Sequence, residues 1–153
     1  MYKRILVAIE NASGDEVILN HVRALAQLTG ARLVLVHVAD GWVARHYDEL
    51  KLRESEEMRE DREYLEHLCA GLLAGGFQVE WRLGMGDPAR ELIRMASLEH
   101  VDLVAMATHG HRGLSDLLHG TTVNQVRHEV GVPVLLVPAA RSASVAAPAA
   151  DRT

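Results

Sequence analysis

The chain has 153 residues, of which 48% are hydrophobic and 24% are charged, and its formal net charge at pH 7 is −5. This length is typical of one domain with its own hydrophobic core, and the composition is typical of a globular protein rather than a disordered or membrane protein. The acidic balance, without a cluster of Lys and Arg on any predicted face, argues against a nucleic acid or a membrane as a partner.

Five short apolar runs alternate with helix-length segments along the chain, which is the pattern of β-α-β units. The runs cover residues 4–9, 32–38, 77–83, 101–107 and 132–137. The first two are almost continuous in Val, Leu and Ile, which predicts central strands that are covered on both faces. The third alternates apolar and polar residues, which favours an edge strand with one solvent-facing side.

Four segments have the apolar spacing of helices. They cover residues 13–30, 47–73, 89–98 and 121–130. Ser13 and Glu16 predict a capping box at the start of the first helix, and Gly30 predicts its end. Asp87 and Pro88 predict the cap and the first residue of the third helix.

Four polar or reactive residues fall in segments with a predicted apolar face. Glu54 and Asp61 interrupt the apolar stripe of the long acidic helix, so we expect the middle of that helix to face solvent. Cys69 lies beside leucines in the same helix, and we expect this single cysteine to fill the core. His37 lies in a predicted buried strand, which indicates a hydrogen-bonded core histidine.

The two ends of the sequence bear on location and domain limits. The first apolar run is too short for a signal peptide, and Glu10 follows it, so we expect a cytoplasmic protein. Residues 139–153 are mostly small and of low complexity, which predicts a disordered tail after a single domain over residues 1–138.

The stretch after the fourth run has features of a phosphate-binding site. Gly110 lies just past a predicted strand end, and Gly120 and Thr121 lie at a predicted helix start. Glycines let backbone amides approach a phosphate closely, and free amides at a helix N-terminus bind anionic oxygens. The alternative is that Gly110 only ends a strand and Thr121 only caps a helix. From the residues alone, both interpretations stay open.

This stretch resembles the signature of the universal stress protein family, which is Gly-x-x-Gly, nine residues, then Gly-Ser/Thr. It matches as Ala107-x-x-Gly110, nine residues, then Gly120-Thr121. The resemblance extends to the opening strand, the His-Val end of the second run and the closing Val-Pro-Val-Leu-Leu-Val, and so covers residues 2–138. It implies an α/β fold, with a Rossmann-like open sheet of five parallel strands in the order 3-2-1-4-5 and helices on both faces.

In the nucleotide-binding branch of that family, the ends of the first two strands hold adenine and ribose, and the glycine motif holds the phosphates. By position, the resemblance implies that the base and ribose contacts are Ala8, Ile9, Glu10 and Val38. The other implied site residues, mainly phosphate contacts, are Met106, Ala107, His109, Gly110, His111, Gly113, Gly120, Thr121 and Thr122. The implied ligand is ATP, with ADP or AMP as alternatives and Mg²⁺ or Mn²⁺ as a candidate companion.

Two positions depart from the family pattern. Ala107 stands where the first motif glycine belongs, and Glu10 replaces an aspartate that is common among the binders. Alanine obstructs the site only if the backbone there has a positive φ or the ligand touches its Cα. Two functions therefore stay open: an ATP-binding stress-response regulatory protein, or a nucleotide-free stress or scaffold protein of the same fold. For an enzyme, at most a slow ATPase, the sequence offers no convincing general base or essential lysine.

Two competing motifs are weaker. Residues 84–89 fit a relaxed Gly-x-Gly-x-x-Ala dinucleotide fingerprint, but they follow the third run and contain Asp87-Pro88, which favours a turn and a helix cap. His109, His111 and His119 lack a nearby cysteine or a matched carboxylate, so we predict no metal site there.

The fifth run is apolar on both faces, although the implied strand order makes it a sheet edge. An open apolar edge strand invites aggregation, so another element must cover it. We expect two copies to form a homodimer across Val134, Leu135, Leu136 and Val137, which the family resemblance also implies.

Overall fold

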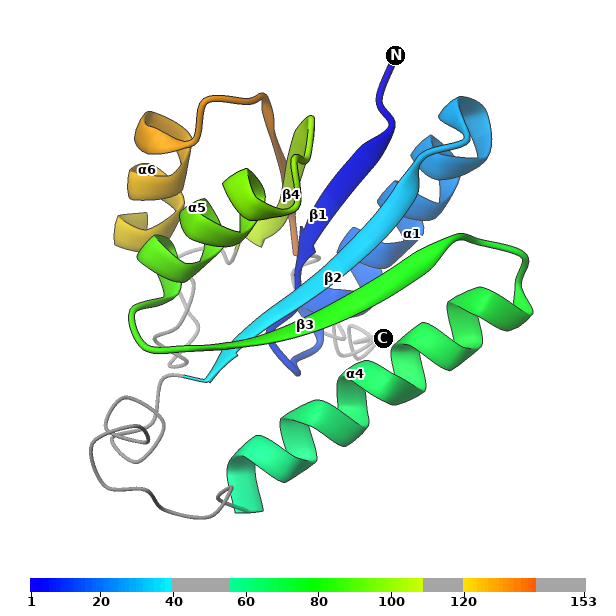
Figure 1. Ribbon diagram of the computed structural model, residues 1–153, viewed down its shortest axis with the longest axis horizontal. Coiled ribbons are helices and arrows are strands. Elements are labelled where there is room, and N and C mark those ends of the chain that lie inside the picture. The colour runs from blue at the N-terminus through cyan, green and yellow to red at the C-terminus, as the bar shows by residue number, and fades with distance from the viewer. Residues whose placement is uncertain (40–55, 109–119, 140–153) are drawn as a thin grey trace, which may run out of the picture.

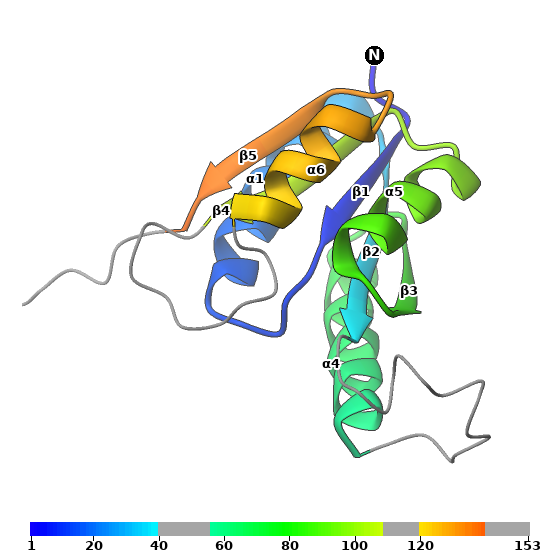
Figure 2. The ribbon, with the colours of Figure 1, turned by 90° about the vertical axis from the view of Figure 1, so that its left-hand side faces the viewer.

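The computed structural model describes residues 1–39, 56–108 and 120–139. Within these residues, helices pack on both faces of one parallel sheet (Figures 1 and 2). The elements in chain order are β1 (Arg4–Ala8), α1 (Gly14–Thr29), β2 (Arg32–Ala39), α4 (Glu56–Ala74), β3 (Val79–Met85), α5 (Pro88–Leu98), β4 (Leu103–Thr108), α6 (Gly120–Glu129) and β5 (Val134–Pro138). The sheet order is β3-β2-β1-β4-β5, which confirms the predicted fold class and strand order. The predicted tail beyond residue 139 lies outside the described residues.

The last three strands begin two residues later than predicted. The apolar residues that precede β3 and β4 instead close the helices before them. The Phe77 amide donates to the Leu72 carbonyl at 3.1 Å, and the Val101 amide donates to the Ala96 carbonyl at 3.1 Å. Hydrophobicity alone does not separate a strand from the apolar residue that closes the preceding helix. The predicted stop at Gly30 is confirmed, since this residue has φ 71° and its amide donates to Ala26.

The core has two halves, one on each face of the sheet. On one face, Ile5 and Leu35 belong to a buried cluster with residues of α1 and α4. On the other face, Leu6 and Val34 belong to a buried cluster with residues of α5 and α6. All four side chains are fully buried, so β1 and β2 are the central strands that their continuous apolar runs predict.

The start of α1 differs from the prediction. Ser13 has a helical backbone and its side chain makes no capping hydrogen bond, so the predicted capping box is wrong. The buried Asp15 carboxylate takes this place by accepting the backbone amides of Glu10 at 2.9 Å and Ala12 at 3.1 Å. It also accepts the Tyr64 hydroxyl at 2.9 Å. Burial and the Asp15 carboxylate raise the pKa of Tyr64, so its hydroxyl keeps the proton that it donates.

The middle of α4 also differs from the prediction. Asp61 does not face solvent: it is 7% exposed and its carboxylate bonds His37 and Asn11. A polar residue within an apolar stripe faces solvent only when it has no buried partner. Asp61 has such a partner, because its carboxylate pairs with His37. Glu54 lies outside the described residues. Cys69 is buried in the core cluster beneath α4, as expected.

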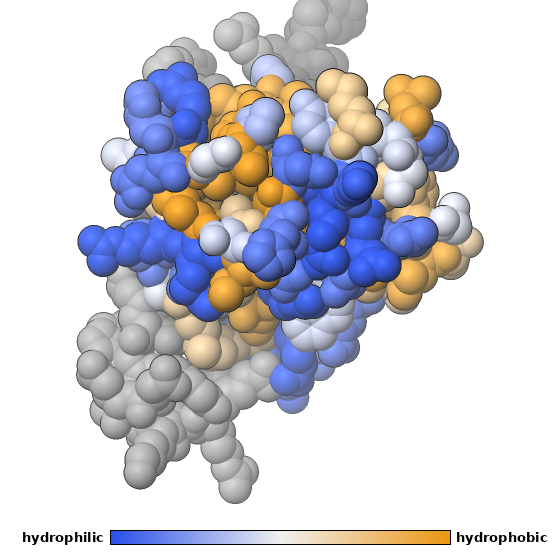
Figure 3. Space-filling model, turned by 45° about the horizontal axis from the view of Figure 1, so that its top comes forward, coloured by the Kyte–Doolittle hydropathy of each residue, from blue (hydrophilic) through white to orange (hydrophobic). Residues whose placement is uncertain are grey.

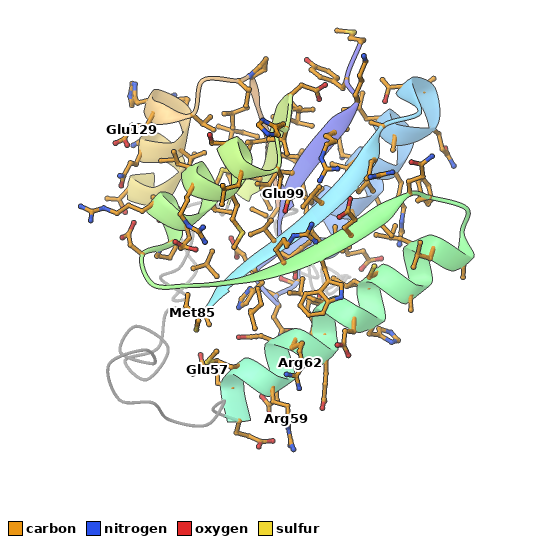
Figure 4. All side chains as sticks on the ribbon, viewed as in Figure 1. Glu57, Arg59, Arg62, Met85, Glu99 and Glu129 are labelled. Carbon is orange, nitrogen blue, oxygen red and sulfur yellow. The ribbon has the colours of Figure 1, made fainter. Side chains whose placement is uncertain are left out.

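Charged side chains cover the part of the sheet that α5 leaves open at the amino-terminal halves of β1, β2 and β3 (Figures 1 and 3). Glu80 of β3 pairs with Arg4 of β1 at 3.3 Å and with Arg32 of β2 at 3.2 Å. Arg82 pairs with Glu99, which is labelled in Figure 4, at 2.6 Å. Such partly exposed pairs contribute modest stability one by one. They give β3 the polar side expected of an edge strand and disfavour pairing with another strand.

The turn before α5 agrees with the predicted cap. Gly86 has φ 110°, and the Asp87 carboxylate accepts the Arg90 amide at 2.9 Å. Residues 84–89 are therefore the end of β3, a turn and a helix start, as the sequence favours.

Replacing Asp87 by alanine is expected to lower the free energy of unfolding by about 1 kcal/mol, because the Arg90 amide loses its acceptor. Asp87→Ser keeps an acceptor at this position and should recover most of the loss. Urea unfolding followed by circular dichroism measures both variants. Equal stability of Asp87→Ala and the parent chain would show that this cap does not stabilise α5.

Candidate functional site

A small pocket that is open to solvent lies at the carboxyl ends of β1 and β2, beside the first turns of α5. Its lining residues are Ala8, Ile9, Glu10, Val36, His37, Val38, Pro88 and Leu92. The strand order reverses between β1 and β4, and ligands of open α/β sheets bind beside such a reversal, outside the carboxyl ends of the strands. The pocket therefore lies where this fold class places its ligands.

The structure brings together the four residues predicted to contact base and ribose. Ala8, Ile9, Glu10 and Val38 all line the pocket. The sequence analysis missed four further lining residues, which are Val36, His37, Pro88 and Leu92. A signal for Val36 was available, because side chains two residues apart on a strand share a face and Val38 was already a candidate.

The predicted phosphate residues that the structure describes lie in two neighbouring elements. Met106 and Ala107 are buried in β4, and Gly120, Thr121 and Thr122 form the first turn of α6. None of these five lines the pocket. The remaining candidates, His109, Gly110, His111 and Gly113, lie outside the described residues, as does His119.

Ala107 fits the backbone at its position. Among the described residues other than glycine, Asn11 and His100 have a positive φ, and Ala107 does not. It pairs with Val137 inside the sheet. Alanine would obstruct the site if the backbone there had a positive φ, and this condition is not met.

The loop after β1 is held by buried polar groups. Asp15 accepts two of its amides, as described above. The Ile9 carbonyl oxygen lies 2.7 Å from Nδ1 of His37, and the Asn11 side-chain amide donates to Asp61 at 3.3 Å. Nε2 of His37 lies 3.0 Å from Asp61 Oδ2, which confirms the expected hydrogen-bonded core histidine. Residues of α1, β2 and α4 thus fix the loop that lines the pocket.

The environment shifts both members of the His37–Asp61 pair toward their charged forms. Burial alone would lower the pKa of His37, but its bonds to Asp61 and Ile9 and the negative charges of Asp61 and Asp15 raise it above the ordinary value. Burial alone would raise the pKa of Asp61, but His37 and the Asn11 bond lower it. These opposite directions are those of an ion pair.

The lining chemistry suits a flat, partly apolar ligand. Val36, Val38 and Leu92 belong to the apolar cluster beneath α5, and Glu10 is the only carboxylate among the described lining residues. The described parts of the chain contain no group of three or more His, Cys, Asp or Glu side chains arranged to hold a metal ion. Within the same residues, no helix is both long enough and apolar enough to cross a membrane.

Comparison with known proteins gives consistent matches. The model of the universal stress protein family matches residues 1–138. The universal stress protein MJ0577 of Methanocaldococcus jannaschii is 28% identical over 157 residues, covering 90% of this chain and 95% of that protein. A universal stress protein of Thermus aquaticus is 31% identical over 137 residues, covering 90% of this chain and 99% of that protein.

Solved structures agree with these matches. The structure of MJ0577 superposes with a TM-score of 0.75 at 29% identity, covering 93% of this chain and 99% of that chain. A universal stress protein of Archaeoglobus fulgidus, solved in complex with dAMP, superposes with a TM-score of 0.65 at 18% identity, covering 89% of this chain and 98% of that chain. The latter likeness shows a shared fold.

Proposed function

Because the chain belongs to the universal stress protein family, we propose that it binds an adenine nucleotide at the carboxyl ends of β1, β2 and β4. ATP is the proposed ligand, with ADP and AMP as alternatives, and a divalent cation, Mg²⁺ or Mn²⁺, would accompany the phosphates. The observation that carries this proposal is the pocket beside the strand reversal, which is lined by all four predicted base and ribose contacts. The dAMP bound to the Archaeoglobus fulgidus protein is a ligand of the same chemical class.

The pocket would take the nucleoside end of the ligand. Val36, Val38 and Leu92 offer an apolar surface for the base. Transfer of the base from water to this surface is favourable. The Glu10 carboxylate lies in the same pocket and would accept hydroxyl groups of the ribose. Because these contacts involve only the base and the ribose, they would bind adenosine itself as well as AMP, ADP and ATP.

The first turn of α6 would take the phosphate end. Backbone amides at a helix N-terminus bind phosphate oxygens, and the helix dipole favours negative charge there. Thr121 is exposed in this turn and adds a hydroxyl donor. We therefore propose separate contacts for the base and for the phosphates, which variants can test one at a time.

Direct binding measurements test the proposal. Mass spectrometry of small molecules released from the purified, denatured protein should detect an adenine nucleotide. Calorimetry should show binding of ATP, ADP or AMP to the nucleotide-free protein. Absence of binding at millimolar nucleotide would instead favour the nucleotide-free stress or scaffold protein. One feature favours that alternative: Glu10 lines the pocket with a side chain one methylene longer than aspartate.

Replacing Thr121 by valine is expected to weaken ATP binding about tenfold, because one hydrogen bond to a charged phosphate is lost. Valine keeps the shape of threonine, and position 121 is exposed, so the fold should not change. Calorimetry with adenosine is the matched control, since adenosine has no phosphate and should bind both proteins equally. Equal loss for adenosine and ATP would place Thr121 outside the phosphate contacts.

We further propose that the chain acts as a homodimeric regulatory protein of the cytoplasm. The second edge of β5 has no neighbouring strand among the described residues, and Val134, Leu135 and Leu136 are half-buried there. Val134 and Leu136 pack toward α5 and α6, whereas Leu135 packs toward the opposite core cluster, so both faces of this edge are apolar. Pairing with the β5 of a second copy would cover them.

A further inference from the structure

The imidazole of His37 lies between two oxygen atoms, and this fixes where its protons are. Nδ1 lies 2.7 Å from the Ile9 carbonyl oxygen, which can only accept, so Nδ1 carries a proton. Nε2 lies 3.0 Å from Asp61 Oδ2. A neutral ring protonated on Nδ1 would turn the Nε2 lone pair toward a carboxylate. The geometry therefore requires one more proton, shared by Nε2 and Asp61.

This pair joins three elements behind the pocket. His37 belongs to β2, Asp61 belongs to α4, and Ile9 is the first residue after β1. Asn11, which has a left-handed backbone with φ 58°, also donates to Asp61. Both strand ends that line the pocket are thus fixed to α4 through one ring and one carboxylate.

The ring lies on the α4 face of the sheet and not on the α5 face. The neighbours Val36 and Val38 pack toward α5, whereas the His37 ring bonds Asp61 of α4, on the other face of the sheet. The side chains of His37 and Asp61 are 7% and 9% exposed. On the α5 side of the pocket, a bound nucleoside would meet the neighbouring side chains Val36 and Val38.

We propose that His37 and Asp61 are positioning residues, which hold the loop after β1 in its binding conformation only while they share the extra proton, so that nucleoside binding and proton binding are coupled. This inference rests on the proposed function. Loss of the proton would leave one N–H for two oxygen atoms, so a ring lone pair would face either the Asp61 carboxylate or the Ile9 carbonyl oxygen, and the link between α4 and Ile9 would weaken. The loop residues Ile9 and Glu10, which line the pocket, would then lose their support.

Of the other ionisable groups near the ring, Asp15 acts in the same direction as Asp61. Asp15 of α1 adds negative charge that raises the pKa of His37, and Glu10 lies in the loop on the pocket side. Tyr64 of α4 donates to Asp15 and stays neutral because its own pKa is raised. Burial opposes these effects, and the net pKa of His37 still lies above the ordinary value.

The directions of the two shifts set the pH range of the effect. Because the pKa of His37 is raised, its share of the stabilisation is complete below the ordinary histidine value of about 6.5 and is lost as the pH rises through the raised value. Because the pKa of Asp61 is lowered, its share is complete above the ordinary value of about 4 and is lost as the pH falls. The pair is therefore intact between about pH 4 and pH 6.5 and weakens on the alkaline side.

The test measures adenosine affinity between about pH 6 and pH 9. Adenosine has no phosphate, so direct attraction between an anionic ligand and the imidazolium cannot produce the effect. We expect the wild-type dissociation constant to rise about tenfold over this range, which corresponds to a one-unit difference in the pKa of His37 between bound and free protein. By the same linkage, adenosine should raise the pKa of His37 measured from its ring resonances by NMR.

Asp61→Asn is the matched variant. The asparagine amide can donate to Nε2 of a neutral ring and its oxygen can still accept from Asn11, so the contacts remain without the extra proton. We expect Asp61→Asn to bind adenosine with an affinity that hardly changes with pH. His67→Gln, at an exposed position of the same helix, should keep the wild-type pH profile.

The outcomes separate this inference from the proposed function. Wild-type affinity that does not change with pH would overturn the inference, and so would an Asp61→Asn profile equal to that of the wild type. Absence of binding of adenosine, AMP, ADP and ATP at every pH would overturn the proposed function together with the coupling. Wild-type measurements alone decide the question if Asp61→Asn does not fold.

Discussion

Replacing Asp15 by alanine is expected to lower the free energy of unfolding by about 3 kcal/mol. Asp15 is 2% exposed, and its carboxylate accepts the amides of Glu10 and Ala12 and the hydroxyl of Tyr64. Alanine would leave these three donors without this acceptor, and a buried donor without a partner costs far more than the net gain of one hydrogen bond. Chemical unfolding followed by circular dichroism measures the loss.

The same substitution should weaken nucleotide binding, because the two amides belong to the loop that lines the pocket. Asp15→Asn keeps oxygen and shape at this position and should lose less stability than Asp15→Ala. Asp87→Ala is the matched control, since that carboxylate also accepts a backbone amide but lies at an exposed cap. If both alanine variants lost about 1 kcal/mol, Asp15 would be an ordinary cap without a special role in the loop.

Replacing Leu135 by aspartate is expected to raise the dissociation constant of the proposed homodimer by at least about 100-fold. Leu135 is the second residue of β5 and is half-buried in the single chain. In a symmetric pair the change occurs twice, so two carboxylates would lose water in one apolar contact. Light scattering with size-exclusion chromatography at several concentrations should show a dimer for the parent chain and a monomer for Leu135→Asp.

Leu28→Asp is the control for this experiment. It makes the same chemical change at a leucine of α1 that is 86% exposed, and it should remain dimeric. Thermal unfolding should show that Leu135→Asp is folded at the temperature of the measurement. A parent chain that is monomeric at micromolar concentration, or a Leu135→Asp variant that stays dimeric, would contradict pairing through β5.

The fold was predictable because its main signals are local and repeated. Each strand is a short apolar run, each helix has its own spacing, and their alternation implies parallel strands. The predicted strand starts are wrong where an apolar residue fits either the start of a strand or the end of the preceding helix. Phe77 and Val101 are apolar like the strands that they precede, yet their amides close the ends of α4 and α5. No pattern of hydrophobicity contains that distinction.

The polar errors have a different cause. Ser13 and Glu16 match a capping box, but the nearby Asp15 carboxylate reaches the loop amides and makes such a box unnecessary. Asp61 looks solvent-exposed because its partner, His37, belongs to a strand far away in the sequence. Buried pairs between distant residues become visible only when the tertiary structure is known.

The candidate site was predictable in part. The family resemblance indicated Ala8, Ile9, Glu10 and Val38, and the structure places all four in one pocket. It did not indicate Pro88 and Leu92, because the wall that they form depends on how α5 packs against β2. The phosphate contacts stay predictions, since much of the glycine motif lies outside the described residues.

The two edges of the sheet differ in character, and in the proposed homodimer this would limit how many copies can associate. The edge at β3 has the charges of Glu80 and Arg82, whereas the edge at β5 is apolar. A molecule with one self-complementary sheet edge can pair with one other copy, and the resulting dimer has closed two-fold symmetry. A second sheet edge able to pair with other copies would allow open-ended growth into filaments. In the proposed homodimer, the charges of β3 would therefore stop association at two copies.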